Sequence, residues 1–90
     1  MSERVRELEM EQIRFDRLFD RILRDPTNQQ LRVEAGEILF RNGQEKEALS
    51  MLQSVVRAAP RHREANRALA DYYRRIGDTS RAEFHQRQAH

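Results

Sequence analysis

The chain has 90 residues, of which 38% are apolar and 36% charged, and it contains three glycines and two prolines. At this length it forms one small domain, and so few chain-breaking residues favour helix over strand. The absence of cysteine excludes disulfides, thiolate chemistry and cysteine-ligated metal centres. The net charge is only +2, and the 17 basic and 15 acidic side chains alternate along the sequence, which argues against nucleic-acid binding.

The N-terminal region predicts one long amphipathic helix over residues 3–24, which we treat as a segment of its own, residues 1–25. It has no internal breaker and ends before Pro26, because proline disfavours helical geometry in the residue before it. Met10 and Ile13 lie off its apolar stripe, which suggests contact with a second subunit or with sequence outside this chain. The alternative is that they are scattered apolar residues of the surface. The stripe itself consists of Val5, Leu8, Phe15, Leu18, Phe19, Ile22 and Leu23.

The first ten residues carry alternating charges and no apolar run. We therefore expect neither a secretory signal nor a membrane span. This predicts a soluble, cytoplasmic chain, unless the sequence is a piece of a longer protein.

Four further helices follow in the order of the chain. Thr27 and Gln30 form a capping-box pattern at the start of the second helix, which continues to Asn42 and Gly43. The third spans about residues 45–58. The fourth covers about residues 62–76, with Ile76 on its apolar face, and the fifth begins after residue 78 or 79 and continues to the end.

The sequence contains an internal repeat of 34 residues. Proline, glycine and alanine each recur with this spacing, and their structural roles differ, since proline ends a repeat, glycine turns the hairpin and alanine allows close helix approach. Agreement among three independent markers predicts a repeat architecture. The pairs are Pro26 with Pro60, Gly43 with Gly77, and Ala48 with Ala82.

The two units resemble tetratricopeptide repeats, which are helix-turn-helix units of this length. The first unit matches the family pattern at Gly36, Ala48 and Pro60, and the second at Leu69, Tyr73 and Ala82. Both lack the family's tryptophan, and polar Gln86 replaces its large aromatic residue, which suits a solvent-facing end. The resemblance covers residues 26–90 and implies an all-α, helix-turn-helix repeat superhelix of about five helices, with repeats at about 27–60 and 61–90.

The N-terminal helix shares part of this repeat pattern. Leu18 and Ile22 correspond to apolar positions of the third helix 34 residues later, as in the second half of an incomplete repeat. Arg14 and Arg21 stand where that third helix has small or apolar residues. A longer helix that caps the first repeat or pairs with another chain is therefore the alternative.

The resemblance implies a concave groove, lined by the first helix of each repeat, that holds an extended peptide or a partner's helix. Arg67, Arg74 and Arg75 would hold an acidic group and Phe40 an apolar one. Alternatively, the arginines pair with Glu64, Asp71 and Asp78 on a solvated surface. The groove candidates are Gln30, Val33, Glu37, Phe40, Arg41, Glu64, Arg67, Asp71, Arg74 and Arg75.

One subclass of the family grips the terminal carboxylate of chaperones through asparagine and lysine in this groove. Here Glu37 and Asp71 occupy groove positions, where a negative charge would repel such a ligand. We therefore do not expect this mode of binding.

Catalytic and metal-binding patterns are absent from the sequence. His62, His85 and His90 are not spaced by three or four residues, so we expect them to be exposed and to bind no metal. There is no nucleophile elbow and no glycine-rich phosphate loop, so neither an enzyme nor a cofactor is predicted.

The sequence therefore predicts a protein-protein interaction module. The alternative is a self-associating or capping segment of a larger repeat scaffold. Homo-oligomerisation is expected as readily as a monomer, because repeat proteins need about three units for stability and this chain supplies two and a half.

Overall fold

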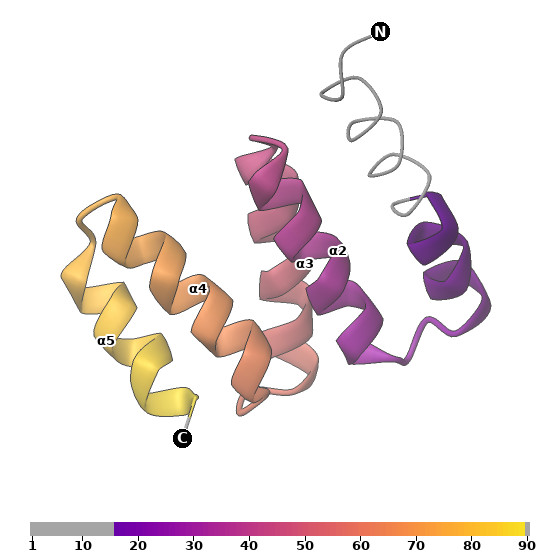
Figure 1. Ribbon diagram of the computed structural model, residues 1–90. Coiled ribbons are helices and arrows are strands. Elements are labelled where there is room, and N and C mark those ends of the chain that lie inside the picture. Colours follow the sequence, from indigo (N-terminus) through magenta and orange to yellow (C-terminus); the bar gives the residue numbers. More distant parts are fainter. Residues whose placement is uncertain (1–15, 90) are drawn as a thin grey trace, which may run out of the picture.

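The computed structural model describes residues 16–89, which form helices joined by short turns, with no strand in that range (Figure 1). Residues 16–24 form an N-terminal helical segment. It is followed by α2 (Gln29–Arg41), α3 (Glu45–Ala58), α4 (Arg63–Arg75) and α5 (Thr79–Gln88). This confirms the predicted all-α, tetratricopeptide-like repeat fold. Within residues 16–89 no helix is long and apolar enough to cross a membrane.

The two hairpin turns are built alike. Gly43 and Gly77 adopt positive φ angles of 78° and 83°, which side chains disfavour. After Gly43 the backbone N–H of Gln44 bonds to the carbonyl of Leu39 at 2.9 Å, and the same bond recurs after Gly77. These are Schellman turns, and they explain why both glycines mark the ends of helices in the sequence.

The start of α2 differs from the predicted one by a single residue. The N-cap is Asn28, whose side chain accepts a hydrogen bond from the backbone N–H of Leu31 at 3.4 Å. The predicted capping box is wrong, because the Thr27 hydroxyl bonds instead to Asp25 and the Gln30 amide reaches across to α4. An asparagine caps a helix as well as threonine does or better, so it prevails here.

The helices are arranged as two stacked hairpins. Helix α2 packs against α3, and α4 packs against α5, while α3 and α2 both contact α4 (Figure 1). The N-terminal segment packs on the far side of the first hairpin from α5. The order is therefore that of two helix-turn-helix repeats, preceded by one further helix.

Two apolar clusters hold these elements together. The smaller one joins Leu18 and Ile22 of the N-terminal segment to Leu31 and Ala35 of α2. The larger one spans both hairpins and fixes their stacking. Its buried members are Val33, Leu52, Val55, Ala65, Leu69, Tyr72, Tyr73 and Ala82.

Three residues that were expected on apolar faces are exposed instead. Phe19 and Leu23 are 44% and 67% exposed, because α2 covers only the side of the N-terminal segment that carries Leu18 and Ile22. Ile76 is 55% exposed, since it lies at the C-cap of α4, beyond the last packed turn. Val5, Leu8 and Phe15 lie outside the described residues, as do Met10 and Ile13.

A polar network stands where the family has its tryptophan in the second repeat. Asn66 is 1% exposed, and its amide nitrogen donates to the carbonyls of Pro60 at 3.0 Å and His62 at 2.8 Å. Its oxygen accepts from Nδ1 of His85 at 2.9 Å. The His85 ring stacks on Tyr73 with centroids 5.6 Å apart.

His85 is therefore half-buried, which corrects the expected exposed histidine. Burial of the ring lowers the pKa of His85 below its usual value. The neutral ring, protonated at Nδ1, fits the hydrogen bond to Asn66. Every polar atom of the Asn66 side chain thus has a partner, which makes a buried amide acceptable in the tryptophan position.

Candidate partner-binding surface

The candidate groove is formed by α2 and α4, whose equivalent positions lie 34 residues apart. Near the starts of both helices, the amide of Gln30 donates a hydrogen bond to the carboxylate of Glu64 at 2.5 Å. These two residues occupy the same position in successive repeats. The bond therefore links the two groove helices, and it means that both of these predicted groove residues already have a partner within the chain.

An aromatic stack lies near the other end of the groove. The half-buried ring of Phe40 on α2 stacks on Tyr72 of α4, with centroids 5.1 Å apart and an angle of 24°. The guanidinium of Arg75 lies 5.9 Å from the centre of the Phe40 ring, within the range of a cation-π contact. Phe40 is thus fixed in place while part of its surface stays open.

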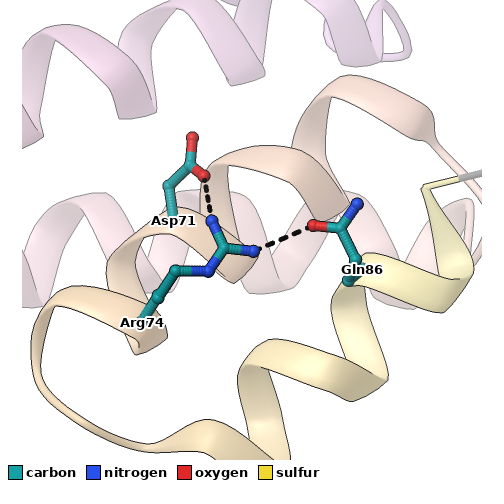
Figure 2. A network of polar contacts seen from close by, with 3 residues as sticks. All are labelled: Asp71, Arg74 and Gln86. Atoms are coloured by element: carbon teal, nitrogen blue, oxygen red, sulfur yellow. Dashed lines mark hydrogen bonds and ion pairs between the residues drawn. The ribbon is translucent and has the colours of Figure 1, made fainter.

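Arg74 is held by two partners at the edge of the groove. Figure 2 shows its Nη1 donating to Asp71 at 3.2 Å and its Nη2 donating to Gln86 of α5 at 3.0 Å. Asp71 offsets part of the charge of Arg74, so the alternative of internal pairing holds for this arginine. The other two acids of that alternative have different partners, because Glu64 bonds to Gln30 and Asp78 pairs with Arg81 at 3.6 Å.

The remaining groove arginines are free of ion pairs within residues 16–89. Arg41, Arg67 and Arg75 are all exposed, and none lies within ion-pair distance of a carboxylate in this part of the chain. Arg41 and Arg75 end α2 and α4 and stand one repeat apart. Arg75 contacts the Phe40 ring, and Arg41 directly follows Phe40 in the sequence.

Glu37 lies near the middle of the groove surface of α2. Partial burial, and then the neighbouring carboxylate of Glu64, raise the pKa of Glu37. Arg41 acts in the opposite direction, and Glu34 adds a further rise. Acidic and basic side chains therefore alternate along the groove helices, and the arginines Arg41 and Arg75 stand at their ends.

Val33 is the one predicted groove residue that the structure excludes from ligand contact. Its side chain is 0% exposed and belongs to the larger apolar cluster. The repeat pattern alone places it at a groove position, but in the fold this position is covered by the larger apolar cluster, which includes residues of α3 and α4. Val33 is thus part of the core beneath the groove surface, whereas its equivalent Arg67 is exposed.

The structure also shows a hollow that the sequence did not reveal. It has a volume of about 360 Å³ and lies between the N-terminal segment and α2. The signal in the sequence that could have revealed this hollow is the 34-residue repeat, which aligns the N-terminal segment with α3 and α2 with α4. Its lining consists of Arg17, Leu18, Arg21, Glu34, Glu37, Ile38 and Arg41.

No group of histidine, cysteine or carboxylate side chains in residues 16–89 is arranged to hold a metal ion. Instead, His62 caps α4 by accepting from the backbone N–H of Ala65 at 3.3 Å. His85 bonds to Asn66. Both described histidines thus have structural contacts.

The stacked hairpins with a 34-residue period define a helical-repeat protein. Comparison with protein families agrees, since the family model for the tetratricopeptide repeat matches residues 17–72, more than half of the chain. The chain belongs to the tetratricopeptide repeat family. The matched range begins within the N-terminal segment. Comparison with curated proteins gives no significant match.

Tetratricopeptide repeats generally mediate protein-protein interaction and are typically not enzymes. Their stacked units leave an extended concave surface, which suits elongated ligands. A role in protein interaction therefore follows from membership of the family.

Proposed function

We propose that the concave face of α2 and α4 binds a peptide segment of a partner protein. The observation that carries the proposal is the stack of Phe40 on Tyr72, with the guanidinium of Arg75 over the Phe40 ring. A partly exposed aromatic ring that is already immobilised costs little ordering entropy when a ligand covers it. Aromatic and arginine side chains are also those that dominate binding energies at interfaces.

The concave face also offers charged groups for orientation. Arg67 and Arg75 are exposed and have no ion pair within residues 16–89, so they can bind carboxylates of a ligand. Glu37 on the same face favours a basic residue, so a ligand that carries charges of both signs complements this surface.

The test is a selection with the full chain against a displayed library of random peptides, followed by titration of the selected peptides. We expect Phe40→Ala, Arg67→Ala and Arg75→Ala each to weaken binding at least several-fold. Lys46→Ala on the exposed surface of α3 is the matched control. Normal binding by all three groove variants, with helicity unchanged, would show that the concave face is not the binding surface.

Self-association is the second candidate function. It is favoured by the exposure of Leu23 and Phe84, which are 67% and 55% exposed at opposite ends of the array. Light scattering over a concentration series would reveal a mass above the 10.8 kDa of one chain. Under this hypothesis the double change Met10→Glu with Ile13→Glu places charges in the contact and converts the oligomer into a monomer. A concentration-independent monomer would rule the hypothesis out.

A further inference from the structure

The hollow beside the N-terminal segment has a mixed lining. Leu18, which is buried, and half-buried Ile38 supply apolar surface. Arg17 and Arg21 come from the N-terminal segment, whereas Glu34 and Glu37 come from α2. One wall is therefore basic and the other mostly acidic, with apolar surface between them.

The repeat pattern shows what the equivalent place contains one unit later. Advancing the lining by 34 residues leads to positions of α3 and α4, of which Leu52, Val55, Ala68 and Tyr72 belong to the larger apolar cluster or pack against it. That place is filled by α2, whose Phe40 stacks on Tyr72, the equivalent of Ile38. Val33 of α2 belongs to the same cluster. The hollow is thus the position that the first helix of a preceding repeat would occupy.

The lining differs from its equivalent in chemistry. Where the later site has Val55, the hollow has Arg21, and where the later site has Ala68, it has Glu34. An entirely apolar helix would bury these charges without partners, which is costly. An occupant must therefore be apolar along its centre and carry charges on both flanks.

These wall charges are available to an occupant. Arg17, Arg21, Glu34 and Glu37 make no ion pair within residues 16–89. Partial burial is the first cause of the raised pKa of Glu37, and the carboxylates of Glu64 and Glu34 add to it, whereas Arg41 acts in the opposite direction. A cation from an occupant would relieve this repulsion, and a carboxylate would pair with the arginines of the other wall.

We propose that this hollow binds an amphipathic helix of a partner protein. The apolar stripe of that helix covers Leu18 and Ile38, its acidic flank faces Arg17 and Arg21, and its basic flank faces Glu34 and Glu37. This site lies beside the concave face and is separate from the Phe40 stack, so it goes beyond the proposed function.

The experiment uses the full chain and three synthetic helical peptides that share one leucine stripe. The first has glutamates on one flank and lysines on the other, the second has glutamates on both flanks, and the third has lysines on both. Binding is followed by the NMR signals of the Leu18 and Ile38 methyl groups. We expect the two-signed peptide to bind about tenfold more tightly than either of the others, because each of those places like charges against one wall.

A charge-reversed hollow provides the decisive comparison. Arg17→Glu with Arg21→Glu makes both walls acidic, so we expect the lysine peptide to become the tightest ligand. Arg61→Glu with Arg63→Glu, which reverses two exposed charges elsewhere, should leave the original preference intact. If the double reversal impairs folding, Arg17→Gln with Arg21→Gln should still lower the affinity of the two-signed peptide several-fold.

Other results would overturn the proposal. Equal affinity for all three peptides, or shifts confined to methyl groups outside the hollow, would exclude a charge-matched helix site. A dimer that Arg17→Glu with Arg21→Glu dissociates would identify a second copy as the occupant. Methyl contacts from Ile38 to residues 1–15 would show that the chain fills its own hollow. The variant Phe40→Ala with Arg75→Ala should still bind the helical peptide in the hollow. Loss of binding at the concave face can therefore be distinguished from loss of binding in the hollow.

Discussion

Gly36 of α2 lies directly over the side chain of Leu52 of α3. A Cβ atom on this glycine would stand 2.9 Å from Cγ and 3.1 Å from Cδ2 of that leucine, which is 0% exposed. At the equivalent position of the second repeat the pair is Ala70 and Gln86. Glycine is therefore required where α2 approaches a large buried side chain.

The first prediction follows from this contact. Gly36→Ala should lower the free energy of unfolding by about 1 to 2 kcal/mol, because overpacking a filled core outweighs the gain in helix propensity. The measurement is urea unfolding followed by circular dichroism. Helix propensity alone predicts that the alanine variant is more stable than the original chain. A more stable variant would therefore show that the contact with Leu52 does not limit this position.

The second prediction concerns the start of α2. Asn28→Ala should reduce stability by about 1 kcal/mol, since it removes the acceptor for the backbone N–H of Leu31. Thr27→Ala should have a much smaller effect, because the Thr27 hydroxyl bonds only to the exposed Asp25. Thermal unfolding of both variants checks the assignment, and the reverse order of effects would restore Thr27 as the cap.

The third prediction is a pH dependence that arises from His85. Its pKa is lowered by burial, so the folded chain favours the neutral ring more than the unfolded chain does. The resulting stability is fully present above the unfolded pKa of about 6.5 and is lost as pH falls toward the folded pKa. Urea unfolding between neutral and mildly acidic pH should show this loss.

His85→Gln is the matched variant for that measurement, because its amide can donate a hydrogen bond to Asn66 without titrating in this range. The difference in stability between the original chain and the variant should shrink or change sign as the solution is acidified. A difference that stays constant with pH would show that His85 does not cause the dependence.

The fourth prediction concerns Glu37, whose pKa is raised. In this case the folded state favours the protonated carboxyl. The contribution of this carboxyl to stability is therefore present below its ordinary pKa of 4.5 and is lost as pH rises through the folded pKa. Glu37→Gln should therefore stabilise the chain at neutral pH but not at pH 4. The gain should stay below about 1 kcal/mol because the side chain is exposed to solvent.

Glu34→Gln, one turn earlier on the same helix, provides a comparison for Glu37. It removes a neighbouring charge that contributes less to the shift than Glu64 does. We expect a smaller gain at neutral pH from this change. An equal or larger gain from Glu34→Gln would show that Glu37 is not the carboxylate on which the repulsion acts most strongly.

The sequence predicted those parts of the fold that local chemistry determines. The two hairpin turns depend on Gly43 and Gly77, whose backbone conformation favours glycine wherever the rest of the chain lies. The same is true of the helix stop before Pro60. These features need only a few neighbouring residues, and their positions agree with the structure.

Features that depend on tertiary contacts were harder to predict. Val33 occupies a groove position in the repeat pattern, but only the approach of α2 to α4 shows that it is covered. The Asn66 and His85 pair is 19 residues apart and has no local signature. The hollow was missed for the same reason, since its walls come from helices whose mutual position the sequence does not state.

The Asn66 side chain also has a mechanical consequence. Its two bonds to the carbonyls of Pro60 and His62 brace the turn that joins one repeat to the next, and its bond to His85 attaches that turn to α5. One buried amide thus ties the turn between the repeats, α4 and α5 into a single unit within the second hairpin.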